Sequence, residues 1–219
     1  MKKELFHLLA LLLVAASLSA QERPLSVSIQ AGPSIATVKP AYSEAFDPQF
    51  RSGFFAGGTL RWAFAKHWSL PVDLSYAQRG FAYTTASTPL SVNGQWIAYR
   101  GKVDYRASYF DVTPQIEFSP IQPLGIALGF YVAWRLAEDI RYGDVVDWTD
   151  TKYIPLFKNN DMGLQLKVSG HFKGLLLFAA CQFGLASSSD LPITDENGQS
   201  LGTMGLKNRS FTAGAGYRF

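Results

Sequence analysis

Residues 124–136 have the sequence LGIALGFYVAWRL, in which every even position carries a large apolar side chain. The odd positions are mostly small, and one of them is Arg135. Successive side chains of a β-strand point to opposite faces, whereas a helix would scatter the large residues around its circumference. Residues 124–136 are therefore predicted to form a strand with one wholly apolar face.

The same period of two recurs outside this stretch and predicts seven further strands. Five of them are clear, and two, residues 25–37 and 174–187, alternate less regularly. The clear ones cover residues 54–64, 68–76, 109–118, 162–168 and 211–219.

The connections between these strands alternate in length. Three short links are expected at residues 65–67, 119–123 and 173–174, and four long ones roughly at 39–51, 84–104, 138–160 and 188–207. Three tight turns and four longer loops are typical of an up-and-down barrel with both termini at the periplasmic end. The predicted fold is all-β, an eight-stranded antiparallel up-and-down transmembrane β-barrel that is monomeric.

The composition of the two strand faces indicates which one meets lipid. Only 17% of the residues are charged, against about 25% in average soluble domains. The large apolar face carries no charge, and a lipid-facing Lys or Arg costs roughly 2–4 kcal/mol near the bilayer midplane. The other face is small and polar, and we expect its charges, which also include Arg218, to pair inside a filled lumen. The predicted lumen cluster is Arg61, Asp73, Asp111, Glu117, Arg135 and Lys167.

Two features leave alternatives open. A soluble lipocalin-like ligand binder would carry the same alternation with its apolar face inside. Pro114 lies in the middle of a predicted strand, where its missing N–H interrupts the ladder. Either a local bulge or an early end of the strand would accommodate it.

The amino terminus has the layout of a secretory signal peptide. A short basic segment precedes the apolar run 5–16, and small residues follow it. We expect cleavage between Ala20 and Gln21, which leaves residues 21–219 as one barrel domain exported through the periplasm. Cleavage after Ser19 is the alternative, and an uncleaved anchor helix would need a longer apolar run. The single Cys181 excludes an intramolecular disulfide and a cysteine-rich zinc site. The net charge of +3, without a run of Lys or Arg, argues against nucleic acid as a partner.

Candidate chemistry is sparse. His171 shares its strand face with Ser169 and Lys167, which leaves a lipid-modifying enzyme as an alternative function. However, residues i and i+2 of a strand lie too far apart for direct general-base catalysis. The acidic residues of the third long link lack the glycine-bearing spacing of a calcium loop. We therefore expect no catalytic residue, metal or cofactor.

Four basic residues near the second long link are candidates for contact with the phosphates of lipopolysaccharide. They are Arg79, Arg100, Lys102 and Arg106. The apolar face predicts outer-membrane lipid as the surroundings of the chain, and these basic residues either contact lipopolysaccharide or are simply solvated.

Four stretches resemble the PorT-type outer-membrane β-barrel family of Gram-negative bacteria. They are GFFAG at 53–57, LSYAQRG at 74–80, YFDVTP at 109–114 and KNRSFTAGAGYRF at 207–219. The resemblance covers essentially the whole mature chain, although Thr113 and Gln115 are more polar than the family pattern. It implies location in the outer membrane and a structural, adhesive or secretion-accessory role, with a secretion system or surface molecule as partner. The last stretch also resembles the signal read by the barrel-assembly machinery, with Phe211, Tyr217 and Phe219 on one face.

Overall fold

The structure is a computed structural model that describes residues 24–40, 47–92, 95–121, 123–151, 156–194 and 200–219. All of its regular elements are β-strands. They are β1 (Leu25–Pro40), β2 (Arg51–Ala65), β3 (Trp68–Val92), β4 (Gln95–Phe118), β5 (Leu124–Tyr142), β6 (Val146–Asp150), β7 (Asn160–Phe172), β8 (Leu175–Gly184), β9 (Ser189–Thr194) and β10 (Ser200–Arg218). The described part of the chain contains no helix that is long and apolar enough to cross a membrane.

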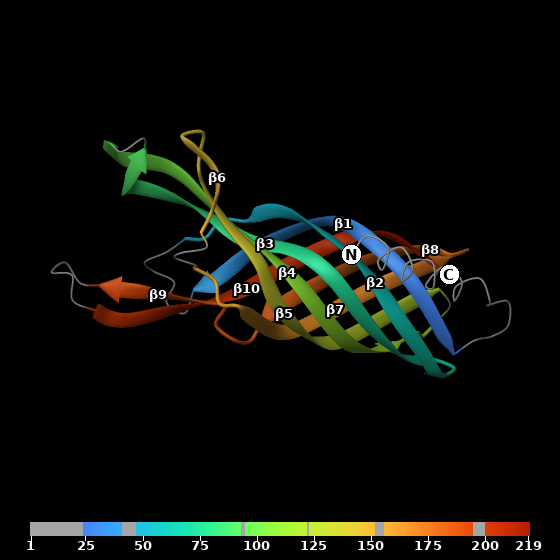
Figure 1. Cartoon of the computed structure of the whole chain (residues 1–219). Helices are drawn as coiled ribbons and strands as arrows, with labels where there is room; N and C mark the ends of the chain where they lie inside the picture. Colours follow the sequence, from blue (N-terminus) through green and yellow to red (C-terminus); the bar gives the residue numbers. More distant parts are fainter. Residues whose placement is uncertain (1–23, 41–46, 93–94, 122, 152–155, 195–199) are drawn as a thin grey trace, which may run out of the picture.

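Eight of these strands form a closed ring (Figure 1). Each pairs antiparallel with its neighbour in the order β1-β2-β3-β4-β5-β7-β8-β10, and β10 pairs again with β1. β6 and β9 lie outside the ring, where they pair with the far ends of β5 and β10. The ring confirms the predicted eight-stranded antiparallel barrel.

Glycines let the backbones of β1 and β10 approach each other closely at the seam. A Cβ atom added at Gly32 would lie 2.1 Å from the carbonyl oxygen of Ala213, and one added at Gly214 would lie 2.2 Å from that of Ala31. Only glycine fits at these two positions, because any other residue would force the strands apart.

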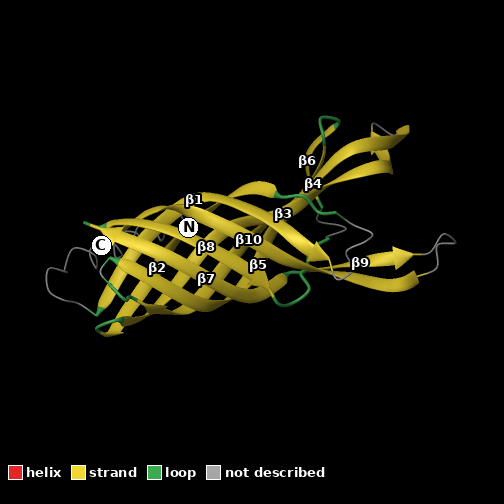
Figure 2. Cartoon of the chain, turned by 180° about the vertical axis from the view of Figure 1, so that it is seen from behind, coloured by secondary structure: helices red, strands yellow, loops and turns green. Residues whose placement is uncertain are grey.

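The two ends of the ring differ (Figure 2). At one end lie the start of β1, the C-terminus and the three short turns, which bond to one another: the Ser119 amide donates to His67, and the Arg218 amide donates to Gly174. We call this the periplasmic end, following the rule that both termini of such barrels lie there. At the other end the β3–β4 and β9–β10 hairpins project well beyond the ring.

Three of the four predicted long loops contain strands. β3 continues to Val92 and β4 begins at Gln95, so most of the expected 84–104 link is a hairpin. The links expected at 138–160 and 188–207 likewise contain β6 and β9. In these segments the strands continue to pair through their backbones, but their outward side chains are no longer regularly apolar. The alternation used to predict the strands therefore stops before the strands themselves end.

Pro114 needs neither a bulge nor an early strand end. β4 runs through it to Phe118, and the register against β3 and β5 is the same on both sides of it. The irregularity between β4 and β5 lies further up, between Ser108 and Tyr109.

The two faces of the ring are sorted as predicted from the alternation. Large apolar side chains cover the outside of every ring strand; on β5, for example, Ile126, Leu128, Phe130 and Trp134 are all exposed. The inside holds most of the buried polar side chains. This is the reverse of a lipocalin-like arrangement, in which the apolar face lines the cavity.

Candidate functional site

A network of polar side chains crosses the middle of the lumen. The Asp73 carboxylate accepts hydrogen bonds from Lys167 Nζ at 2.9 Å and Gln115 Nε2 at 2.8 Å. Lys167 also donates to Gln30 Oε1 at 3.0 Å, and Thr59 Oγ1 donates to Asp73 as well. These groups come from β1, β2, β3, β4 and β7, so the network ties opposite walls of the ring together. Gln115, which departs from the PorT pattern, is one of its members.

A second network, nearer the loop end, is centred on Arg79. The buried guanidinium forms ion pairs with Asp111 and with Asp161, and donates to Gln182 Oε1 at 2.9 Å. It lies between the rings of Tyr109 and Tyr131, whose centroids are 5.0 and 4.8 Å from its central carbon. Planar guanidinium groups suit such stacked and forked sites better than lysine does. Asp161 receives further hydrogen bonds from Tyr131 and Asn208.

Above this network the lumen is closed by apolar side chains. Phe157, in the segment between β6 and β7, is buried and packs against Phe81 with their ring centroids 6.0 Å apart. Its backbone N–H donates to Glu138 Oε2, which holds the segment in place. The buried cluster around it comprises Val38, Phe81, Ala107, Tyr109, Tyr131, Ala133, Phe157 and Leu206. The interior is thus filled by a polar middle and an apolar top.

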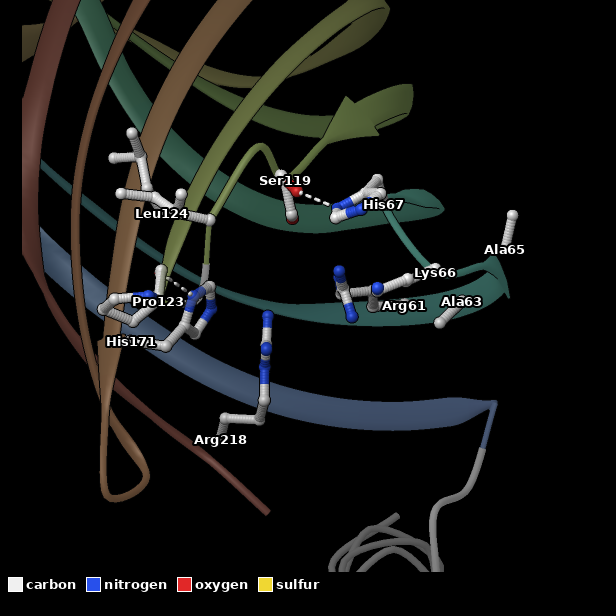
Figure 3. A pocket seen from close by; sticks show the side chains of 11 residues that line it. Arg61, Ala63, Ala65, Lys66, His67, Ser119, Pro123, Leu124, His171 and Arg218 are labelled. Atoms are coloured by element: carbon white, nitrogen blue, oxygen red, sulfur yellow. Dashed lines mark hydrogen bonds between the residues drawn. The ribbon is translucent and has the colours of Figure 1, made fainter.

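The periplasmic end of the lumen carries the third set of charges. Arg61 Nε donates to Glu117 at 2.8 Å, and Ser69 donates to the same carboxylate oxygen at 3.0 Å. Arg218, on the last strand, lines the same pocket as Arg61 (Figure 3).

The six residues predicted as one lumen cluster are divided among several places. Asp73 and Lys167 pair in the middle, Asp111 joins Arg79, and Arg61 pairs with Glu117. Arg135 lies near the loop-end rim, where it pairs with Glu138 and donates to Asn159. Charges of opposite sign were predicted on the right face, but sequence alone does not give their partners.

Arg79 is the site residue that the sequence interpretation misplaced. It was grouped with the basic residues of a loop, but only 1% of its side chain is exposed and it lies inside the lumen. The signal was available in the sequence, since Arg79 continues the inward parity of Asp73, Ser75 and Ala77 on β3. Its partners Asp161 and Gln182 were also missed, because each lies at the loop end of its strand.

The other candidate residues are not brought into a catalytic arrangement. His171 Nδ1 lies 3.3 Å from the carbonyl oxygen of Pro123 at the periplasmic end, and Ser169 points into the lumen. No hydrogen bond joins His171 to Ser169 in the described part of the chain. Of the acidic residues, Glu138 pairs with Arg135 and Asp139 with Arg106. No cluster of three metal-ligating side chains occurs among the described residues.

The terminal aromatic residues Phe211, Tyr217 and Phe219 share the outer face of β10 and are about half exposed. The rings of Tyr217 and Phe219 contact each other edge to face at 5.2 Å. The expected signal cleavage between Ala20 and Gln21 lies outside the described residues.

A closed antiparallel ring with an uncharged apolar outside and a charged inside defines a transmembrane β-barrel protein. The family described as "Outer membrane protein beta-barrel domain" matches residues 19–190. The chain belongs to this family and is a protein of the outer membrane.

Solved structures similar to this chain are also outer-membrane proteins. Ail, the attachment invasion locus protein of Yersinia pestis, is 16% identical with a TM-score of 0.45, over 89% of this chain and 99% of Ail. Neisserial surface protein A is 12% identical with a TM-score of 0.48, over 88% of this chain and 97% of its own. OprG from Pseudomonas aeruginosa is 12% identical with a TM-score of 0.43, over 90% of this chain and 97% of OprG. No curated protein matches the chain.

Proposed function

We propose that this protein is a closed outer-membrane barrel of the PorT type, with a structural, adhesive or secretion-accessory role and no general porin activity. The observation that carries the proposal is the filled lumen. Eight strands leave an interior just wide enough for side chains to fill. Here it is occupied by the side-chain networks around Asp73 and Arg79, by the Arg61–Glu117 pair and by the apolar cluster around Phe157. A path for hydrophilic solutes would have to break buried ion pairs on Asp73 and Arg79.

The loop end supports a role in contacting other molecules. The β3–β4 hairpin projects beyond the ring and exposes Trp96. Near the base of the projecting part, Arg51, Arg106 and Arg141 surround the ring of Trp148 at 4.3–5.1 Å. Arg–aromatic clusters of this kind are frequent in recognition surfaces.

Lipopolysaccharide is the first partner that we propose for this end. Arg100 and Lys102 are exposed on β4, where the hairpin leaves the ring. Basic side chains at this position are suited to phosphate groups on the outer leaflet. Surface molecules or a secretion system would be contacted by the more distant parts of the hairpins.

Vesicle swelling tests the closed lumen. Phospholipid vesicles containing the purified protein should take up arabinose no faster than protein-free vesicles, because side chains obstruct the lumen along most of its length. Vesicles with a known open porin at the same protein-to-lipid ratio serve as the positive control. Swelling at a rate close to that of the porin would contradict the proposal.

Deletion of Phe219 tests the proposed contact with the barrel-assembly machinery. We expect the folded protein in the outer membrane to fall at least several-fold, because the deletion removes the last member of the terminal aromatic set. Folded protein is measured from the change in gel mobility between unheated and boiled membrane samples. Phe172→Ala, which removes an exposed aromatic from the periplasmic end of β7, is the matched control. An equal loss in both variants would point to lost membrane anchoring instead of lost recognition.

A further inference from the structure

The periplasmic end of the lumen opens into a pocket of about 560 Å³ (Figure 3). Lys66 and His67 of the β2–β3 turn and Ser119 form one side of it. His171 and Arg218 form the other side, and in Figure 3 the guanidinium group of Arg61, beside Lys66, and that of Arg218 point into the same space. The pocket is separate from the loop end, where the proposed function places its contacts.

The lining of this pocket carries an excess of positive charge. Arg61, Lys66 and Arg218 line it, and no carboxylate does. Glu117 borders the smaller cavity deeper in the lumen and is already paired with Arg61 at 2.8 Å.

Arg218 is the unusual member. Its guanidinium forms no hydrogen bond or ion pair with any residue that the structure describes, and its side chain is half-buried. Arg61, which also carries a positive charge, lines the same pocket. A half-buried cation without a protein partner is free to donate to an anion in the pocket.

The pocket ends blindly. The next cavity inward, which shares Arg61, His171 and Arg218 with it, has a volume of only about 10 Å³. Lys167 and Leu176 border that cavity from the lumen side. A ligand therefore enters from the periplasm and stops at the two arginines.

We propose that this pocket binds an oxyanion, phosphate or carboxylate, carried by a periplasmic ligand. Arg218 is its principal contact, and Arg61 is the second. Both kinds of oxyanion match the forked donors of a guanidinium group. The volume exceeds that of a single phosphate, which leaves room for the body of a larger ligand against Ala63, Ala65 and Leu124.

Isothermal titration calorimetry of the full-length protein in detergent micelles tests this, with pyrophosphate as the phosphate probe and citrate as the carboxylate probe. We expect saturable one-to-one binding of at least one probe, weakened by added NaCl. Arg218→Gln should weaken it at least tenfold. Arg218→Lys keeps the positive charge but loses the forked donors of the guanidinium group. Its affinity for the probe should lie between those of the unchanged protein and the Arg218→Gln variant. Arg209→Gln is the matched control, because it makes the same change on an exposed side chain of β10 outside the pocket, and it should bind as the unchanged protein does.

The outcomes are distinct. Binding of pyrophosphate alone identifies a phosphate ligand, and binding of citrate alone a carboxylate ligand. Absence of saturable binding of both probes, or equal binding by the Arg218→Gln and Arg209→Gln variants, overturns the proposal. Heat-dependent gel mobility shows that each variant is folded. Calorimetry tests the oxyanion pocket and vesicle swelling tests the closed lumen, so failure of one proposal does not imply failure of the other.

Discussion

Replacing Arg79 with methionine is expected to lower the free energy of unfolding by about 3–5 kcal/mol, because breaking a buried ion pair leaves its partners as uncompensated buried charges. Asp111 and Asp161 both lose their cation in this variant, and Gln182 loses a donor. Guanidinium-induced unfolding in phospholipid vesicles, followed by tryptophan fluorescence, measures the change.

Two variants show whether the loss comes from the ion network. Arg209→Met, the same replacement at an exposed position of β10, should change the free energy of unfolding by no more than about 0.5 kcal/mol. Adding Asp111→Asn to Arg79→Met should restore about 1 kcal/mol or more, since one uncompensated carboxylate is removed. If Arg79→Met alone costs less than about 1 kcal/mol, the network does not stabilise the fold.

The second large effect is expected on the outer face. Leu128→Arg should lower the free energy of unfolding in vesicles by about 2–4 kcal/mol, the cost of a lipid-facing arginine near the bilayer midplane. Leu128 lies in the central part of the apolar stretch of β5, and Ile116 and Leu166 flank it on the neighbouring strands. The charge therefore has no polar group nearby to receive it.

Leu136→Arg, at the loop end of the same stretch, is the depth control. There the side chain reaches the interface, and the expected cost is about 0–1 kcal/mol. Equal costs at both positions would contradict the placement of the membrane across residues 124–136. A larger cost at Leu136 would mean that the bilayer covers a higher part of the barrel.

The alternation of side chains predicted the ring well because it has a strong physical cause. Lipid on one side and a crowded lumen on the other demand opposite residue types, and any shift by one residue would exchange the faces. Beyond the bilayer both faces meet water, and thus the pattern vanished where β3 and β4 continue to Val92 and Gln95.

The contacts inside the lumen were less predictable. Arg79 could have been assigned by extending the parity of β3, but its pairing with Asp161 joins residues 82 positions apart. Phe157 lies between two strands, so no alternation pattern predicts its burial. Its backbone N–H donates to Glu138, a contact that the sequence does not show. Such contacts depend on which strand ends face each other across the closed ring.

The seam between β1 and β10 has a consequence for the order of assembly. Almost every other pairing in the ring joins strands that follow each other closely, whereas the seam pairs Ser28 with Arg218, near opposite ends of the chain. Closing so long a loop carries a larger entropic cost than forming a hairpin, and it cannot begin before the last strand has been synthesised. Until then both edge strands present unpaired backbone groups, which favour aggregation. Closure is therefore expected to be the late, slow event of folding, and it depends on glycines, Gly32, Gly214 and Gly216, that let the last pair of backbones meet.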